Sequence, residues 1–259
     1  DAQYPQIAPG TPVPNPKLNN PLWQSLEFYS LLNRAWTFGG VREQDKEVVA
    51  QFAKLGIGPG LTFDPAALTA AQRAGLQRAV ETAYQRVMLH SQENGEIRNG
   101  WRFATNLGAY GNNRLLASAI GLMGYGANRA EEALYLPAFL DHENQPLVSD
   151  RNYRIHFTAD NLPPVNEFWS ITLYSRPENQ LKDNPIKRYA FGDRTPTLQR
   201  NADGSIDIYV QQERPEGDKA ANWLPSGESG PIWLILRLYG PQEKALSGAF
   251  VPPVVERQE

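Results

Sequence analysis

The spacing of apolar residues changes partway along this chain, and that change limits the folds open to it. From Leu22 to about residue 124, apolar residues recur every three or four positions, which is the spacing of one helix face. From Tyr153 onward, apolar and polar residues alternate, which is the period of a strand with one buried face. The sequence therefore predicts an α+β protein, with an N-terminal helical segment followed by an antiparallel β-sandwich of jelly-roll type.

Capping residues and glycine stops mark the expected elements. The clearest start signal is Thr69 with Gln72 three residues later, which is a capping box. Helices are expected at 21–36, 42–55, 69–95 and 113–123. Strands are expected at 153–157, 168–174, 206–210 and 232–239.

The same signals predict three parts of the chain. Residues 1–20 contain prolines every few positions, which favours an extended arm over a helix. Residues 21–96 form the predicted helical segment, and residues 97–259 form the predicted jelly-roll-like β domain. The polar opening and the absence of an initial Met indicate export, so we expect a periplasmic or secreted protein.

Composition excludes several classes of function. The net charge of -3 gives no basic field for phosphates, so we expect no nucleic-acid partner. The sequence contains no apolar run long enough for a membrane span. It contains no Cys, which excludes disulfides and thiolate chemistry. The histidines lie far apart in the sequence, so we expect no metal site. The sequence has no Gly-rich phosphate loop, so we expect no cofactor.

Arg237 is the most informative single residue, because it interrupts a strand that is otherwise apolar on both faces. An unpaired guanidinium buried in such a strand is strongly unfavourable. Two interpretations remain open. Either an internal Asp or Glu pairs with Arg237, or the guanidinium binds an anion in a pocket shared with Trp233 and Tyr239.

Two loops add candidate residues. Arg188 and Arg194 surround aromatic residues in a Gly-containing turn, and Asp193 between them is able to accept hydrogen bonds or act as a base. Asn222 followed by Trp223 is a pattern that stacks and binds sugar rings. The alternatives are that the loop charges only face water and that Trp223 packs on its own protein.

A set of short patches is highly specific when taken together. They lie at 99–102, 107–111, 126–128, 131–135, 162–174, 188–195, 203–205, 222–225 and 236–241. They resemble the bacterial domain-of-unknown-function family 1214. The resemblance implies a jelly-roll-like C-terminal domain, an exported protein and a homo-oligomer. The usual companion, the β-domain of family 1254, is expected to be missing, because the region before Leu22 is too short to hold it.

Three functions fit these residues. The first is binding of a small polar ligand, a carbohydrate or a carboxylate, in a pocket between the helices and the jelly roll. The second is a hydrolase or lyase with Asp193 or Glu132 as the base and an Arg that stabilises an oxyanion. The third is a structural subunit of a homo-oligomeric assembly. The predicted ligand-binding residues are Trp101, Arg102, Tyr110, Arg188, Arg194, Asn222, Trp223, Arg237 and Tyr239.

Overall fold

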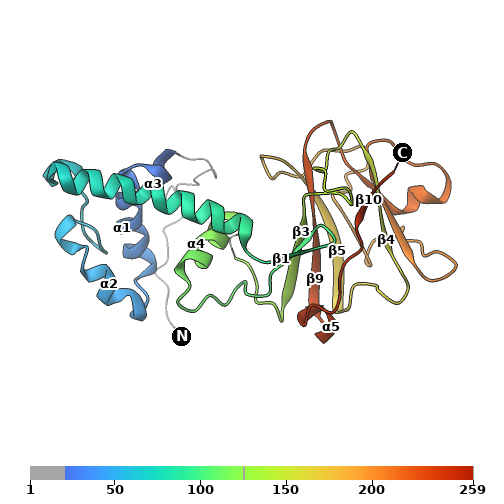
Figure 1. Cartoon of the computed structure of the whole chain (residues 1–259), viewed down its shortest axis with the longest axis horizontal. Coiled ribbons are helices and arrows are strands. Elements are labelled where there is room, and N and C mark those ends of the chain that lie inside the picture. Colours follow the sequence, from blue (N-terminus) through green and yellow to red (C-terminus); the bar gives the residue numbers. More distant parts are fainter. Residues whose placement is uncertain (1–20, 125, 259) are drawn as a thin grey trace. The chain divides into compact units, whose positions relative to one another are not determined.

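The computed structural model describes residues 21–124 and 126–258, and the chain divides into two compact units (Figure 1). The helical unit contains residues 21–92 and returns for Leu115–Met123. The β unit contains Glu93–Arg114 and the described residues from Gly124 onward. The predicted arm, residues 1–20, lies outside the described residues.

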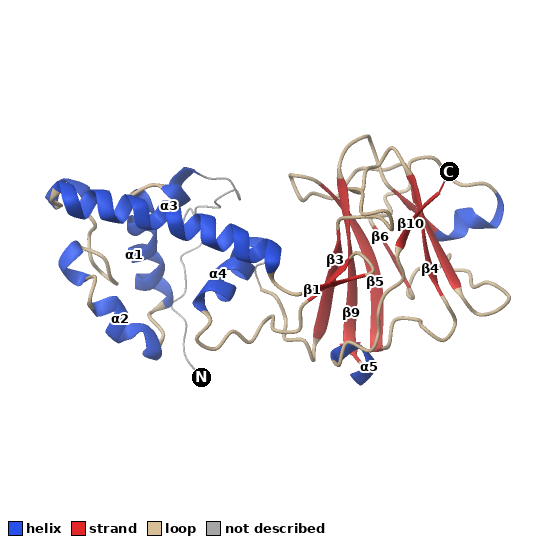
Figure 2. Cartoon of the chain, in the orientation of Figure 1, coloured by secondary structure: helices blue, strands red, loops and turns tan. Residues whose placement is uncertain are grey.

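The helical unit is built from the predicted amphipathic runs (Figure 2). The capping box is confirmed, because the backbone N–H of Thr69 donates to Gln72 Oε1 at 2.9 Å and the N–H of Gln72 donates to Thr69 Oγ1 at 3.2 Å. Its helices are α1 (Glu27–Gly39), α2 (Lys46–Ala50), α3 (Ala70–Glu93) and α4 (Arg114–Met123). The single helix expected over 42–55 is wrong, because short 3-10 turns at Glu43–Asp45 and Ala53–Leu55 flank α2.

One buried amide organises the core of the helical unit. The side chain of Asn33 donates to the carbonyl oxygens of Gly56 and Leu61 at 2.8 and 2.9 Å, and it accepts from the N–H of Gly58 at 2.7 Å. These bonds hold the glycine-rich turn against α1, so its backbone groups are satisfied without regular structure. The apolar core beside the turn contains Tyr29, Ile57, Phe63 and Val80.

Within its described residues, the β unit contains two sheets (Figures 1 and 2). The six-stranded sheet has the order β1 (Glu96–Arg98), β2 (Trp101–Phe103), β3 (Ala133–Ala138), β9 (Ile232–Pro241), β5 (Val165–Ser175) and β6 (Ala190–Gly192). The four-stranded sheet has the order β10 (Val255–Gln258), β4 (Asn152–Phe157), β7 (Ile206–Gln211) and β8 (Trp223–Pro225). Neighbouring strands are antiparallel except β7 and β8, which are parallel. A short helix, α5 (Glu243–Leu246), follows β9.

The two sheets share one apolar core and therefore form a sandwich. Leu234, Leu236 and Leu238 of β9 alternate into this core, where they join residues of the other sheet such as Ile155 and Ile208. Helices therefore precede mainly antiparallel sheets, and the predicted α+β class is confirmed. The alternation also leaves each sheet with an outward row of side chains.

We name these two outer surfaces by their side chains. The aromatic face is the outer face of the six-stranded sheet, and it carries Tyr135, Phe168, Thr172, Tyr174, Trp233, Arg237 and Tyr239. The polar face is the outer face of the four-stranded sheet, and it carries Asn152, Arg154, His156, Asp207, Tyr209, Gln211, Glu256 and Gln258.

Candidate functional site

Arg237 lies in the middle of the aromatic face, half-buried, between Tyr135 of β3 and Ser170 of β5. Its Nη1 donates to Thr172 Oγ1 at 2.7 Å, and its Nη2 donates to the Tyr174 hydroxyl at 3.1 Å. Both acceptors are neutral hydroxyls. Arg237 has no carboxylate partner in the part of the chain that the structure describes, so no described side chain neutralises its charge.

Aromatic stacks lie on either side of Arg237 along β9. Toward the start of the strand, the Trp233 ring stacks on Tyr174, with ring centroids 5.1 Å apart and an interplanar angle of 23°. Toward its end, Tyr239 stacks on Phe168, with centroids 4.3 Å apart and an angle of 17°. The cation is therefore held between flat apolar surfaces, where water screens it less than in bulk solvent.

Two further polar groups belong to this face. The indole Nε1 of Trp233 is buried and has no hydrogen-bond partner among the described residues, which is uncommon for a polar atom. Tyr135 lies opposite Arg237 on β3. Burial raises the pKa of Tyr135, and the neighbouring Tyr239 adds to that rise while Arg237 opposes it. Tyr135 is therefore a neutral phenol at physiological pH, able to donate a hydrogen bond.

Arg194 and Asp193 follow β6 and lie near the Phe168 end of the aromatic face. The guanidinium carbon of Arg194 is 4.0 Å from the centroid of the Phe168 ring, and its side chain is exposed. Asp193 is also exposed, and its Oδ1 accepts from the backbone N–H of Trp169 at 3.1 Å. The structure thus brings Arg194 to the aromatic stack that Tyr239 forms with Phe168.

Arg188, Asn222 and Trp223 form a separate cluster in which each polar group has a backbone partner. Arg188 Nη1 donates to the carbonyl oxygen of Trp223 at 2.7 Å, and burial lowers the pKa of Arg188. Asn222 Nδ2 donates to the carbonyl oxygens of Gln199 and Asp207 at 2.7 and 2.9 Å. The indole Nε1 of Trp223 donates to the Gln211 carbonyl oxygen at 2.9 Å. These contacts hold loops to the four-stranded sheet.

The remaining predicted residues are dispersed over the β unit. The Trp101 side chain is fully buried in the sandwich core, and its Nε1 donates to the Pro253 carbonyl oxygen at 2.7 Å. Arg102 Nη1 reaches the Asn94 carbonyl oxygen at 3.4 Å. Tyr110 is half-buried in a loop, and Glu132 is exposed.

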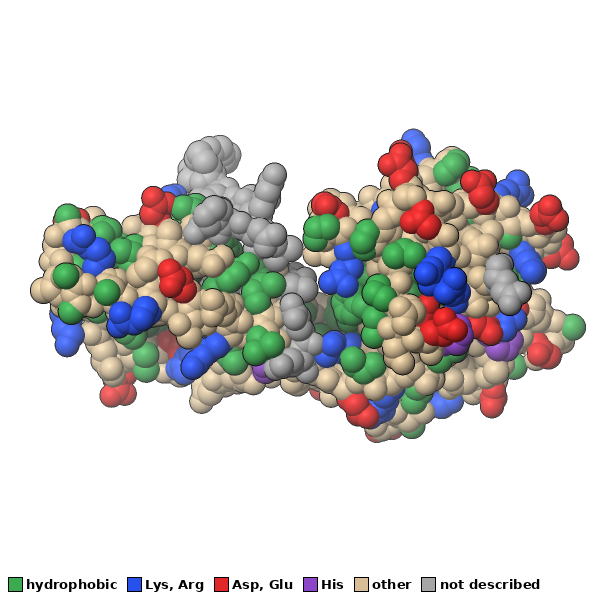
Figure 3. Space-filling model, turned by 45° about the horizontal axis from the view of Figure 1, so that its top comes forward, with side chains coloured by type: hydrophobic (Ala, Val, Ile, Leu, Met, Phe, Trp, Pro, Cys, Tyr) green, Lys and Arg blue, Asp and Glu red, His purple; other side chains and the backbone are tan. Residues whose placement is uncertain are grey.

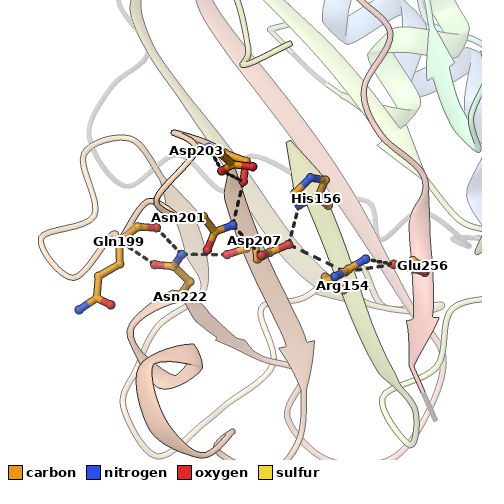
Figure 4. Close-up of polar contacts among 9 residues, drawn as sticks. Arg154, His156, Gln199, Asn201, Asp203, Asp207, Asn222 and Glu256 are labelled. Atoms are coloured by element: carbon orange, nitrogen blue, oxygen red, sulfur yellow. Dashed lines mark hydrogen bonds and ion pairs between the residues drawn. The ribbon is translucent and has the colours of Figure 1, made fainter. Parts of the chain in front are cut away.

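The polar face contains an arrangement that sequence reasoning missed (Figure 4). His156 Nδ1 lies 2.8 Å from Asp207 Oδ1, and Asp207 Oδ2 accepts from Asn201 Nδ2 at 2.8 Å. Beside them, Arg154 Nη2 lies 2.7 Å from Glu256 Oε2. The strand alternation shows that Arg154 and His156 share a face, but their partners come from strands whose register the sequence does not reveal.

Among residues 21–124 and 126–258, no group of three His, Asp or Glu side chains lies close enough to hold a metal ion. No helix in this same part of the chain has the length and apolar character needed to cross a membrane.

The fold and this site define an α+β protein whose sandwich exposes an aromatic face around an unneutralised arginine. Residues 132–243 match the family described as "Protein of unknown function (DUF1214)", so the C-terminal part of the chain carries the family match that the short patches predict. No curated protein matches the chain.

Two solved structures are similar. The VPA0106 protein from Vibrio parahaemolyticus superposes with a TM-score of 0.61 at 22% identity, over 90% of this chain and 55% of that one. A putative uncharacterized protein from Burkholderia cenocepacia gives a TM-score of 0.39 at 20% identity, over 76% of this chain and 46% of that one. The chain thus spans about half the length of these proteins. The first of the two supports the fold.

Proposed function

We propose that the β unit binds a small organic carboxylate on its aromatic face, with Arg237 as the anion-binding residue. The observation that carries this proposal is the half-buried guanidinium whose described partners are all neutral hydroxyls. Keeping a cation in that setting is unfavourable unless an anion approaches it. Guanidinium and carboxylate groups match in shape as well as charge, because they form paired N–H to O hydrogen bonds.

The surroundings of Arg237 favour one kind of carboxylate. The stacked rings of Trp233 and Tyr239 on either side suit a ligand with a flat or apolar body. The half-buried Tyr135 hydroxyl is a donor for a further ligand oxygen, whereas the Trp233 N–H is covered by the protein. A neutral carbohydrate would satisfy the Tyr135 donor but would leave the guanidinium without a counter-charge. The carboxylate is therefore the better match of the two ligand classes that the sequence predicts.

The geometry offers little to the hydrolase or lyase alternative. A general base must reach the substrate beside the group that stabilises the developing charge. Asp193 is exposed and bonded to the Trp169 backbone, and Glu132 is exposed. Neither carboxylate forms a hydrogen bond or an ion pair with Arg237.

The test is a binding screen on the purified chain. Benzoate, other aromatic acids, aliphatic dicarboxylates and neutral sugars are each added in a thermal-shift assay, and hits are measured by isothermal titration calorimetry. We expect an aromatic carboxylate to bind and Arg237→Gln to weaken it about 10- to 100-fold, since a hydrogen bond to a charged group contributes about 1.5–3 kcal/mol. Arg200→Gln, an exposed arginine in a loop, is the matched control.

Two outcomes would contradict the proposal. One is a panel in which no carboxylate raises the melting temperature. The other is a carboxylate that binds Arg237→Gln as tightly as the parent protein. Light scattering on both proteins tests the structural-subunit alternative, since a second copy covering the aromatic face would make the molecular mass depend on Arg237. We expect the mass to be the same for both.

A further inference from the structure

An open hollow of about 680 Å³ lies on the polar face, on the opposite sheet from Arg237. Its floor is formed by outward side chains of the four-stranded sheet, with Tyr209 of β7 as the aromatic member. Its wall is the loop that follows β7, which includes Arg214 and Lys219. The hollow is open to solvent, so a ligand bound there is able to extend beyond it.

Side-chain amides line the strand side of the hollow. Asn152 of β4 and Gln258 of β10 are cross-strand neighbours, and Gln211 lies on β7. The Asn152 amide forms no hydrogen bond with any described residue, and Gln258 Nε2 reaches only the Arg257 carbonyl oxygen at 3.4 Å. Gln211 Nε2 donates to the Glu213 carbonyl oxygen at 2.7 Å. Amides that remain available in this way both donate and accept hydrogen bonds.

The charged side chains that line the hollow come from its loop side. Lys219 Nζ lies 5.4 Å from the centroid of the Tyr209 ring, and it forms no ion pair with any described residue. Arg214 is exposed, and it too has no ion-pair partner among the described residues. Glu216 is the one acidic side chain in the lining, so two cations face one carboxylate. On the polar face beside the hollow, Arg154 and Glu256 pair with each other.

We propose that this hollow binds a segment of an acidic polysaccharide, one whose sugar units carry carboxylates. Available amides suit the hydroxyls of a sugar, the Tyr209 ring suits its apolar face, and Arg214 and Lys219 suit its carboxylates. A nucleic acid is a poorer match, because the lining has amides for sugar hydroxyls but only one aromatic ring, Tyr209, and so no row of rings on which successive bases could stack. On the face shown in Figure 3, acidic and basic side chains are interspersed over the β unit without one large basic patch.

The experiment is affinity electrophoresis of the full chain in gels that contain polygalacturonate, or dextran as a neutral polysaccharide, followed by calorimetry with oligogalacturonate. We expect retardation by polygalacturonate alone. The double variant Arg214→Gln/Lys219→Gln should weaken binding at least 10-fold, and Asn152→Ala a few-fold. The matched control is Lys187→Gln/Arg200→Gln, which removes the same charge at exposed positions outside the hollow and should change affinity less than twofold.

Three results would overturn the site. They are equal retardation by dextran, equal loss of binding in the control double variant, and no binding of oligogalacturonate at 0.15 M salt. Arg237→Gln separates this inference from the carboxylate proposal, because it should leave the retardation unchanged. If instead Arg237→Gln abolishes the retardation and the Arg214 and Lys219 substitutions do not, the polysaccharide binds the aromatic face and the hollow is not its site.

Discussion

The polar face neutralises its strand charges internally, whereas the aromatic face does not. On the polar face, Arg154 pairs with Glu256, and His156 lies against Asp207. On the aromatic face, Arg237 contacts neutral hydroxyls and rings. The same sandwich therefore uses charge in two ways. Paired charges connect neighbouring strands of one sheet, and Arg237 of the other sheet has no carboxylate partner among the described residues.

The largest expected effect is on stability, from Asp207→Ala. The substitution removes the acceptor of both His156 and Asn201. Because those groups would lose a partly buried partner, we expect the free energy of unfolding to fall by about 2 kcal/mol. Arg237→Gln should change it by less than about 1 kcal/mol, because the loss of its hydrogen bonds to Thr172 and Tyr174 is offset by the removal of a half-buried charge that has no counter-charge. Urea denaturation of both variants measures the difference. A larger loss from Arg237→Gln would mean that the aromatic face depends on its charge for stability more than the polar face does.

A smaller effect is expected from matched tryptophan substitutions. Trp101→Phe removes the hydrogen bond from the indole Nε1 to the Pro253 carbonyl oxygen and leaves that acceptor in the core, which should cost about 1–2 kcal/mol. Trp233→Phe removes a buried N–H that has no described partner, so it should lower stability less than Trp101→Phe does. Thermal unfolding followed by circular dichroism tests both. Equal losses would mean that the Trp233 N–H is satisfied after all.

The smallest expected effect is on the loss of stability at low pH. A hydrogen bond from the Ser205 side chain, together with one from its backbone, lowers the pKa of Asp203 near the polar face. A lowered carboxylate pKa stabilises the fold above the unfolded pKa, and this contribution is lost as the pH falls through the folded pKa. Asp203→Asn should therefore lessen the loss of stability below about pH 4. Arg237→Gln should leave that pH dependence unchanged, because a guanidinium stays charged throughout the range.

The local periods in the sequence predict most of the fold. The strand alternation from Tyr153 and the apolar run around Arg237 correspond to β4 and β9, because burial patterns of this kind depend on neighbouring residues alone. The strands β1, β2 and β8 contain three residues each, which is too few for an alternation to be recognised. Their places depend on pairing with distant strands.

The candidate site could be predicted only in part. Arg237 stands out in the sequence because a charge interrupts an apolar strand. Its contacts with Thr172 and Tyr174 depend on the register of β5 against β9, which no local pattern encodes. The pair of His156 and Asp207 could not be predicted either, because the two residues lie 51 positions apart and meet only through the register of β4 against β7. Trp101 is predicted to bind a ligand but lies in the core, and the two could not be told apart because a core indole and a ligand-binding indole look alike in a sequence.

The position of β9 has a consequence for biosynthesis. This strand separates β3 from β5 in the sheet, yet the ribosome makes it after both of them. Until Pro241 has left the exit tunnel, β3 and β5 each lack their shared neighbour, and their backbone edges are open to pairing with other nascent chains. The helical unit is encoded entirely before β3, so it is able to fold before the six-stranded sheet is complete. We therefore expect chaperones that shield extended segments to matter most during translation of residues 133–241.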